Sequence, residues 1–204
     1  MSKTTREHLL DVGLGLMHRD GYNATGLTDI LKAADVPKGS FYHHFGSKED
    51  FAAAALERYG MREREHAADV LSDEAPSPLK RLRRYFSDLV NTYGQQGAIP
   101  GCMMGRFSLE IATTSPQLRK RISGSFSHWQ QTIANVIREA VERKELAADT
   151  NPEALAGFVL NGWEGALLRS QADKSDAPLE GFMRYVFDEL LTKKSTRTGA
   201  KHWS

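Results

Sequence analysis

The sequence predicts an all-α protein, and three observations support this fold class. Apolar residues recur at intervals of three and four along most of the 204 residues, which is the period of a helix with one buried face. No stretch alternates apolar and polar residues cleanly enough to predict a strand. Several periodic stretches open with proline or with an N-capping residue such as Ser115, as helices commonly do.

The first third of the chain predicts short helices separated by tight turns. The expected helices cover residues 4–19, 28–34 and 37–45, and a further helix runs onward from Ser47. Short helices on tight turns are typical of a small recognition module.

The rest of the chain predicts longer helices, each with an apolar face. The first begins near Pro78 and ends near Gly94, and the longest covers residues 116–141. Two more helices, over residues 152–172 and 178–193, have proline in their first turns. Their wide apolar stripes predict a homodimer interface formed by Phe158, Leu167, Phe182, Val186, Phe187 and Leu190.

The composition excludes several classes of protein. With 27 Lys+Arg, 26 Asp+Glu and 40% hydrophobic residues, the chain has the composition of an ordinary globular protein, not of a disordered, collagen-like or coiled-coil one. Its single cysteine, Cys102, cannot form an intramolecular disulfide, which excludes a disulfide-stapled secreted scaffold and most structural zinc sites. A reducing, cytoplasmic environment is therefore expected.

Neither a membrane span nor a metal or cofactor site is expected. The longest apolar segment, residues 155–168, contains Asn161 and Glu164 and is shorter than the roughly 18–20 residues of a membrane-spanning helix. The N-terminal residues are polar and charged, so no signal peptide is expected. Pairs such as His8 and Asp11 have helical spacing but lack a third ligand nearby, and no phosphate loop, dinucleotide fingerprint or nucleophile elbow is present.

The segment TDILKAADVPKGSFYHHFGSKED, residues 28–50, contains the densest functional signal. A short helix ends at a turn over residues 34–36, and Pro37 starts a second helix. No side chain between residues 36 and 48 is acidic. The cations and hydrogen-bonding groups there are Lys38, Ser40, Tyr42, His43, His44 and Lys48. Such a helix face suits the phosphates and base edges of double-stranded DNA.

Two details of this segment favour a close approach to DNA. Gly39 has no side chain to hold the helix away from the duplex. Ser47 is a predicted N-cap, so the helix that follows would direct backbone N–H groups and the Lys48 ammonium at a phosphate. Together these features predict a helix-turn-helix.

The segment resembles the DNA-binding domain of the TetR family of bacterial repressors. The family pattern is a turn ending in Val, then Lys-Gly-Ser/Thr, Tyr-x-x-Phe and a Ser-Lys-Glu helix start. The matching residues are Val36, Lys38, Gly39, Ser40, Tyr42, Phe45, Ser47, Lys48 and Glu49. The resemblance implies an N-terminal three-helix helix-turn-helix domain over residues 1–50, a larger helical ligand-binding and dimerisation domain over residues 51–193, and a basic flexible tail over residues 194–204.

The resemblance also implies which residues contact DNA. In relatives these are the positions of Thr28, Lys38, Ser40, Tyr42, His44 and Lys48. Tyr42 and Lys48 are expected mainly on phosphates, and Lys38 nearest to the bases. Lys3 and Arg6 are expected to form an arm that reaches an adjacent groove. For His43 and His44 the alternative is a solvated side chain, whereas Phe41 and Phe45 are expected in the core.

Charge alone does not predict DNA binding by this domain. Residues 1–50 contain six Lys and Arg residues and seven acidic ones. If the domain binds DNA, its cationic groups must be concentrated on one face.

A second functional signal surrounds Cys102. The stretches IPGCMMG, residues 99–105, and GWEGA, residues 162–166, resemble the AcuR/NemR-like subgroup of the family, in which a Gly-Cys pair opens a helix of the sensory domain. A helix N-terminus, and Arg106 one turn further along, would both lower the pKa of the thiol. A thiolate there would add to an activated alkene, quinone or aldehyde, or would oxidise to a sulfenic acid. The alternative is a small, buried hydrophobic residue.

Further sensing residues are expected near Cys102. Glu164 lies within an apolar stretch and needs a partner, for which Arg106, Arg169 and a ligand are the candidates. The aromatic residues Phe107, Trp129 and Trp163 are expected partly in the core and partly in the wall of a ligand cavity.

These observations predict a homodimeric transcriptional repressor that leaves a palindromic operator when a small molecule binds or when Cys102 is modified. The expected partners are double-stranded operator DNA, a small-molecule inducer or electrophile, and a second copy of the chain. The alternative is an all-α thiol enzyme or detoxifying binding protein that acts on electrophiles. Stoichiometry discriminates the two, because a sensor reacts once per subunit and an enzyme reacts repeatedly.

Overall fold

The computed structural model describes residues 4–94 and 101–192. These residues form helices and no strand, which confirms the predicted all-α class. In chain order the elements are α1 (Thr5–Asp20), α2 (Leu27–Ala34), α3 (Lys38–His44), α4 (Lys48–Leu71), α5 (Pro78–Tyr93), α6 (Met103–Ile111), α7 (Pro116–Glu142), α8 (Pro152–Asp173), α9 (Ala177–Arg184) and the π-helical segment η1 (Tyr185–Leu190). Lys3 and the predicted tail over residues 194–204 lie outside the described residues.

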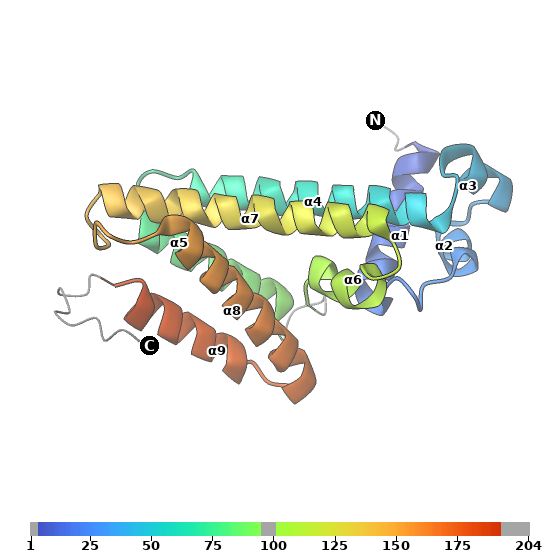
Figure 1. Cartoon of the computed structure of the whole chain (residues 1–204). Helices are drawn as coiled ribbons and strands as arrows, with labels where there is room; N and C mark the ends of the chain where they lie inside the picture. Colours follow the sequence, from blue (N-terminus) through green and yellow to red (C-terminus); the bar gives the residue numbers. More distant parts are fainter. Residues whose placement is uncertain (1–3, 95–100, 193–204) are drawn as a thin grey trace.

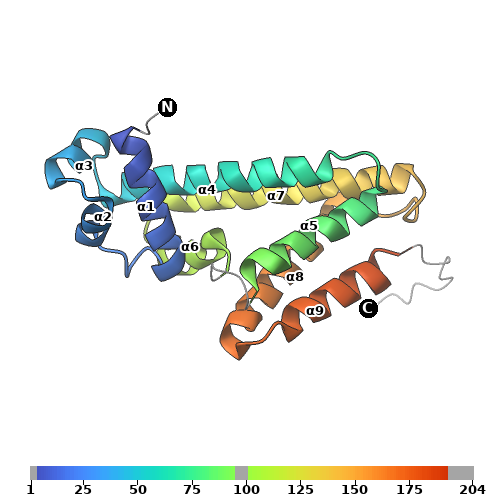
Figure 2. The same ribbon diagram turned by 180° about the vertical axis from the view of Figure 1, so that it is seen from behind.

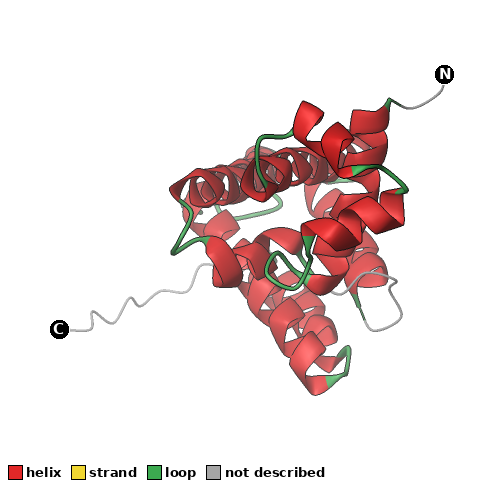
Figure 3. Cartoon of the chain, turned by 90° about the vertical axis from the view of Figure 1, so that its right-hand side faces the viewer, coloured by secondary structure: helices red, strands yellow, loops and turns green. Residues whose placement is uncertain are grey.

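The helices form two parts that share α4 (Figure 1). Helices α1, α2 and α3 gather at one end, and α4 leads from them into a bundle with α5, α7, α8 and α9. The long helices α4 and α7 run side by side in both Figure 1 and Figure 2, and they pack against each other. The short helix α6 lies between α1 and the bundle. Figure 3, seen from the end that carries α3, shows helices joined by loops in both parts.

Local capping bonds set the starts of several helices. Thr4 and Glu7 form a reciprocal capping box at the start of α1. Ser47 accepts a hydrogen bond from the Asp50 N–H at 3.0 Å, and Ser115 accepts one from the Leu118 N–H at 3.1 Å. Both predicted N-caps are therefore confirmed. Each cap depends on residues only three positions apart, which is why the sequence could predict it.

The end of the last helix differs from the prediction. The sequence predicts one helix over residues 178–193, whereas regular α-helix ends at Arg184 and continues as η1. The Leu191 N–H donates to the Val186 carbonyl, five residues earlier, at 2.7 Å. Val186 and Phe187 are buried in this wider turn, as they would be in a regular α-helix. The spacing of apolar residues therefore could not distinguish the two kinds of helix.

An aromatic cluster lies at the centre of the bundle. The ring centroid of Phe86 on α5 is 5.4 Å from that of Trp163, 5.2 Å from that of Phe182 and 5.9 Å from that of Phe187. The rings are tilted against one another, which is a favourable arrangement for aromatic pairs. The cluster joins α5, α8, α9 and η1 into one core.

The residues predicted for the dimer interface divide into buried and exposed ones. Leu167, Phe182, Val186 and Phe187 are buried within the protomer, and Leu190 is half-buried. The four buried side chains therefore belong to the core of the protomer and not to an exposed face. The exposed apolar side chains of α8 and η1 are Phe158, Leu168 and Tyr185.

None of the described helices is both long and apolar enough to cross a membrane. Within residues 4–94 and 101–192, no three His, Cys, Asp or Glu side chains are grouped so that they could hold a metal ion.

Candidate nucleic-acid interface and effector site

Helices α2 and α3 form a helix-turn-helix at one end of the molecule (Figure 1). Asp35 ends α2 in the left-handed region, with φ 52° and ψ 47°, which aspartate tolerates better than most residues. The Val36 N–H bonds to the Leu31 carbonyl at 3.1 Å and tightens the turn. Pro37 then precedes α3, where its fixed φ suits the start of a helix.

The residues predicted to contact DNA lie mostly on the outer surface of this motif. Tyr42 is 50% exposed, whereas Phe41 is 0% and Phe45 is 5% exposed, so α3 has a core face and an outer face. The other exposed residues of the predicted set are Arg6, Thr28, Lys38, Gly39 and His43. Ser40, His44 and Lys48 are half-buried.

Aromatic rings hold two of the cations in place. The Lys48 Nζ lies 4.4 Å from the ring centroid of Tyr22, and the Arg6 guanidinium lies 5.2 Å from that of Phe45. Partial burial lowers the pKa of Lys48, and the charge of Glu110 opposes this shift. Because these long side chains are already restrained, they lose less entropy when they bind a phosphate.

Four acidic residues of the same domain are occupied by local contacts. Three of them act at helix starts: Glu7 accepts from the Thr4 N–H at 2.9 Å, Asp29 from the Gly26 N–H at 3.0 Å, and Asp50 from the Ser47 hydroxyl at 2.9 Å. Asp20 pairs with Arg19 at the end of α1. Carboxylates at helix N-termini also offset the helix dipole. A domain that is not basic overall can therefore present cations on α3.

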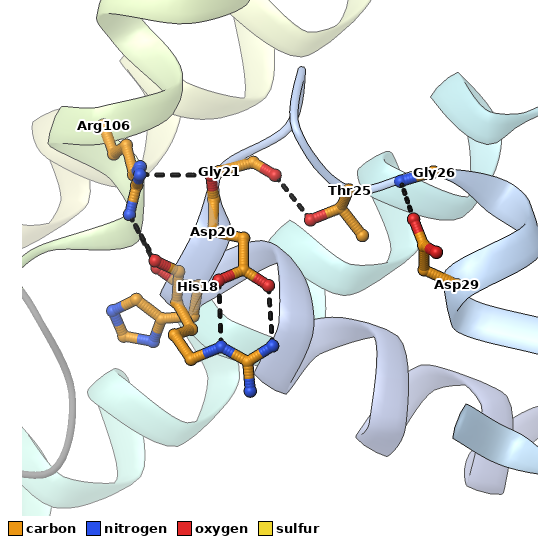
Figure 4. A network of polar contacts seen from close by, with 8 residues as sticks. His18, Asp20, Gly21, Thr25, Gly26, Asp29 and Arg106 are labelled. Carbon is orange, nitrogen blue, oxygen red and sulfur yellow. Dashed lines mark hydrogen bonds and ion pairs between the residues drawn. The ribbon is translucent and has the colours of Figure 1, made fainter. Parts of the chain in front are cut away.

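Arg106 of α6 joins the bundle to the end of α1 (Figure 4). Its terminal nitrogens donate to the carbonyls of His18 at 3.4 Å, Arg19 at 2.6 Å and Asp20 at 3.1 Å. Its Nε donates to Glu110 at 3.1 Å. The last carbonyls of a helix lack intrahelical partners and carry partial negative charge, so a guanidinium stabilises them. Gly21 follows with φ 90°, and a side chain there would clash with Glu110.

Three more contacts connect the same regions. His18 Nε2 on α1 donates to the Gly101 carbonyl, just before α6, at 2.7 Å. The Asn23 N–H, after α1, donates to Glu110 at 2.8 Å. The Ser115 hydroxyl at the start of α7 bonds to Glu49 in the first turn of α4. The first two contacts tie the position of α6 to the end of the molecule that carries the helix-turn-helix, and the third ties α7 to the same end.

Arg106 does not pair with Glu164, and Arg169 pairs with Asp173, so two of the three candidate partners that the sequence offers for Glu164 are excluded. The terminal nitrogens of Arg106 reach the end of α1, and its Nε reaches Glu110. Helical spacing gave the position of Arg106 but not the direction of its long side chain. Glu164 instead lies beside Cys102 in the same cleft, and its Oε1 has no hydrogen-bond partner among the described residues.

Cys102 is the N-cap of α6, but its thiol is not activated as the sequence predicts. The residue is 7% exposed. Burial raises the pKa of the Cys102 thiol well above its ordinary value, and the nearby Glu164 carboxylate raises it further. The prediction of a lowered pKa is therefore wrong, because desolvation of a thiolate outweighs the favourable field of a helix N-terminus.

Two cavities meet at Cys102. The smaller, about 180 Å³, lies between α4, α5 and α7 and is lined by Tyr59, Glu63, Tyr85 and Trp129. The larger is an open cleft of about 1000 Å³ between α6, α7 and α8, and its walls include Arg106 and Glu164. Cys102 and Phe126 line both cavities and so separate them.

The predicted aromatic sensing residues occupy different environments. Trp129 lines the smaller cavity. Phe107 and Trp163 are fully buried. Of the three, only Trp129 lies in the wall of a described cavity, because the other two fill the core between helices.

The sequence analysis missed a polar chain on the other side of Cys102. The Tyr59 hydroxyl donates to the Cys102 Sγ at 3.8 Å and lies 3.1 Å from the Tyr93 hydroxyl, which donates to Glu63 at 2.9 Å. Burial raises the pKa of Glu63. These side chains come from α4 and α5, and on amphipathic helices tyrosines at core positions predict packing only. The spacing along each helix contains no signal that they meet at one cysteine.

Comparison with known families identifies both parts of the chain. Residues 9–55 match a family model described as bacterial regulatory proteins, tetR family. Residues 78–186 match a model described as Tetracyclin repressor-like, C-terminal domain. The first match contains α2, α3 and most of α1, and the second extends from α5 into η1.

Relatives and solved structures resemble the chain over most of its length. The transcriptional repressor DhaR of Mycobacterium sp. (strain GP1) is 34% identical over 94% of this chain and 95% of its own length. The transcriptional regulator AcuR of Cereibacter sphaeroides is 36% identical over 92% of this chain and 85% of its own. The crystal structure of Escherichia coli NemR in its reduced form has a TM-score of 0.84 and 31% identity, covering 90% of this chain and 95% of that one.

Proposed function

Since the chain belongs to the TetR family of bacterial regulatory proteins, we propose that it is a homodimeric repressor that leaves a palindromic operator when its effector site is occupied or when Cys102 is modified. The family is one of DNA-binding regulators, which confirms a regulator over the alternative of a thiol enzyme. The protein acts in the cytoplasm, where its single thiol stays reduced.

The observation that carries this proposal is the double role of α6. Cys102 caps the helix and lines both cavities, and Arg106, four residues later, holds the end of α1. A molecule that displaces the start of α6 therefore also displaces the carbonyl contacts of α1. A hundredfold loss of operator affinity requires only about 2.7 kcal/mol of coupling between the two sites.

On the DNA side, each subunit places α3 in the major groove of one half-site, and the half-sites are about 34–36 Å apart or slightly more. Lys38 lies nearest to the bases, and Gly39 permits close approach of the helix. Phosphate and groove contacts come from Thr28, Ser40, Tyr42, His43, His44, Lys48, Lys3 and Arg6. Residues 1–50 form the DNA-binding domain, residues 51–193 the effector and dimerisation domain, and residues 194–204 a basic tail.

The dimer forms through the outer faces of α8 and η1. Phe158 and Leu168 of α8 and Tyr185 of η1 are 63%, 60% and 54% exposed, and Leu168 also lies in the wall of the open cleft. A C2 dimer buries the same patch on both subunits and sets the distance between the two α3 helices.

The test is fluorescence anisotropy with DNA from the region flanking the chain's own gene. Reduced protein is measured before and after one equivalent of N-ethylmaleimide, in parallel with Cys102→Ser. Specific binding that is lost only when Cys102 is present supports a thiol-responsive repressor. If maleimide leaves specific binding unchanged, the effectors are reversible ligands of the two cavities. If the protein binds no specific site, either in that DNA or in a pool of random sequences, the proposal of a repressor is overturned.

A further inference from the structure

Glu164 is the carboxylate that lies against Cys102. It belongs to α8 and lines the open cleft together with Cys102. Glu164 Oε2 and the Cys102 Cβ both lie within 4 Å of the point that a Cβ on Gly105 would occupy, so the two side chains are neighbours, while Glu164 Oε1 is buried and has no hydrogen-bond partner among the described residues. A buried carboxylate oxygen without a donor is costly, so its retention beside a thiol calls for a chemical explanation.

No described cation neutralises this carboxylate. The other charged side chains that line the cleft are Arg19, Arg106 and Arg119. Arg19 pairs with Asp20, and Arg106 is bound to the end of α1 and to Glu110. On the far side of Cys102 lie Tyr59 of α4, Tyr93 of α5 and Glu63 of α4, and the nearest titratable group of α1 is His18, which donates to Gly101. Burial raises the pKa of Glu164 to about 7.

Gly105 makes room for Glu164 at this position. A Cβ on Gly105, in the first turn of α6, would lie 2.5 Å from Glu164 Oε2. Any other residue at position 105 would therefore push the carboxylate away from its place beside Cys102. The glycine, the thiol and the carboxylate form one local arrangement at the meeting point of α6 and α8.

We infer that Glu164 is the proton acceptor for Cys102 when the thiol adds to an activated alkene, that is, an α,β-unsaturated carbonyl compound or imide. The inference rests on the proposed thiol-responsive function and assigns the residue that makes a buried thiol reactive. Because burial disfavours a free thiolate, the sulfur can attack only if its proton leaves at the same time.

The step balances without an oxidant or reductant. The S–H proton moves to the Glu164 carboxylate as the Cys102 Sγ forms a bond to the β-carbon of the alkene. The π-electrons of the C=C bond move toward the carbonyl to give an enolate. The enolate takes a proton at its α-carbon from the Glu164 carboxylic acid, which restores the carboxylate. The product is a thioether on a saturated carbonyl compound.

The decisive measurement is the rate of N-ethylmaleimide addition to the full-length protein between pH 6 and 8.5, followed by intact mass. For wild type, the rate rises through pH 7 and then levels, because Glu164 must be ionised to accept the proton. Glu164→Gln is expected to react at least tenfold more slowly at pH 8 and to show no levelling, since a general base contributes roughly 10²–10⁴-fold. Glu180→Gln, an exposed carboxyl far from Cys102, is the matched control and keeps the wild-type profile.

The opposite result has an equally definite meaning. The negative charge of Glu164 raises the pKa of the thiol, so if the carboxylate were only a repulsive neighbour, Glu164→Gln would react faster than wild type. An equal or faster rate overturns the inference. Glu164→Asp, which keeps an ionisable carboxyl, is expected to recover part of the rate and the inflection.

A second variant keeps both reacting groups. Gly105→Ala displaces the carboxylate and is expected to slow the addition severalfold, whereas Gly124→Ala, where an added Cβ meets nothing within 4 Å, leaves the rate unchanged. Thermal unfolding of each variant shows whether it folds. If either Glu164→Gln or Gly105→Ala fails to fold, the other variant decides the inference. Operator binding by the fully modified protein is measured separately: if DNA is retained, the proposed sensing function fails although the proton transfer stands.

Discussion

At the scale of the residue, burial decides the chemistry of Cys102. A helix N-terminus and a nearby arginine are features that lower a thiol pKa, and both are visible in the sequence. In the fold the thiol is enclosed, the arginine extends elsewhere, and a carboxylate stands beside it. Reactivity must then come from proton transfer to a neighbour and not from a stable thiolate.

The DNA-binding residues are expected to separate into two classes when they are replaced. Tyr42→Phe and Lys48→Ala remove phosphate contacts and should weaken specific and random DNA alike. Lys38→Ala should also relax base preference, at about 1–3 kcal/mol for the specific site. Anisotropy titrations on operator and scrambled duplexes measure both effects. Equal losses on both duplexes for all three variants would contradict the role of Lys38.

The buried carboxyl of Glu164 should make stability depend on pH. Its pKa of about 7 in the folded protein lies above the ordinary value of 4.5 for an unfolded chain, so folding favours its protonated form. Its stabilising contribution is therefore complete below pH 4.5 and is lost as the pH rises to about 7. Glu164→Gln should raise the Tm at pH 8 by at least the 2–4 °C that corresponds to about 1 kcal/mol, and by less at pH 5. A Tm difference that is the same at both pH values would contradict burial of the charged form.

At the scale of the element, α6 is a short helix whose two ends serve different partners. Its N-cap, Cys102, lies between two cavities, and the side chain of Glu110 bonds to the turn after α1. The side chain of Arg106 bonds to the end of α1 (Figure 4). A helix of nine residues has few packing contacts of its own, so contacts at both ends determine its position. In the proposed mechanism, α6 is therefore the element that couples the effector site to DNA.

Arg106→Ala should uncouple the two sites. The loss of four side-chain hydrogen bonds, three of them to carbonyls of α1, removes roughly 1–3 kcal/mol of stability, while Cys102 is still modified at the wild-type rate. The ratio of operator affinities before and after maleimide should fall from about a hundredfold toward one. Arg169→Ala, which removes an exposed pair with Asp173 on α8, is the control and keeps the wild-type ratio. An unchanged ratio in Arg106→Ala would place the coupling in another element.

At the scale of the whole molecule, the helices of the bundle have apolar side chains both in the core and on the surface. Side chains of α8, α9 and η1 fill the core around Phe86, whereas Phe158 and Leu168 of α8 and Tyr185 of η1 stay exposed. When the apolar face of a helix is wider than the protomer core can cover, we expect the uncovered part to be buried against a second copy of the chain.

Charged substitutions should distinguish the core side chains from the surface ones. Phe158→Glu and Leu168→Glu are expected to give folded monomers, because these side chains are exposed in the protomer. Phe187→Glu should instead unfold the protein, since it places a charge in the core. Leu109→Glu, on the exposed face of α6, should leave the dimer intact. Sedimentation velocity with circular dichroism measures both properties, and a dimer that survives both α8 substitutions would exclude this interface.

Much of the fold was predictable because the signals that determine it are local. Caps such as Ser47 and Ser115 and the apolar period act over three or four residues, so helix starts and core faces followed from the order of the amino acids. The helix-turn-helix was predictable for the same reason, since its turn, glycine and N-cap lie within residues 28–50.

The sequence by itself determined the all-α class, the recognition helix and the position of Cys102 at the start of a helix. Only the tertiary structure decided which apolar residues of α8 and α9 are core, where Arg106 points, and that Glu164 and Tyr59 meet at one buried thiol. The physical reason is that burial, desolvation and side-chain direction depend on partners far apart in the chain, and no local spacing encodes which helices will enclose a given side chain.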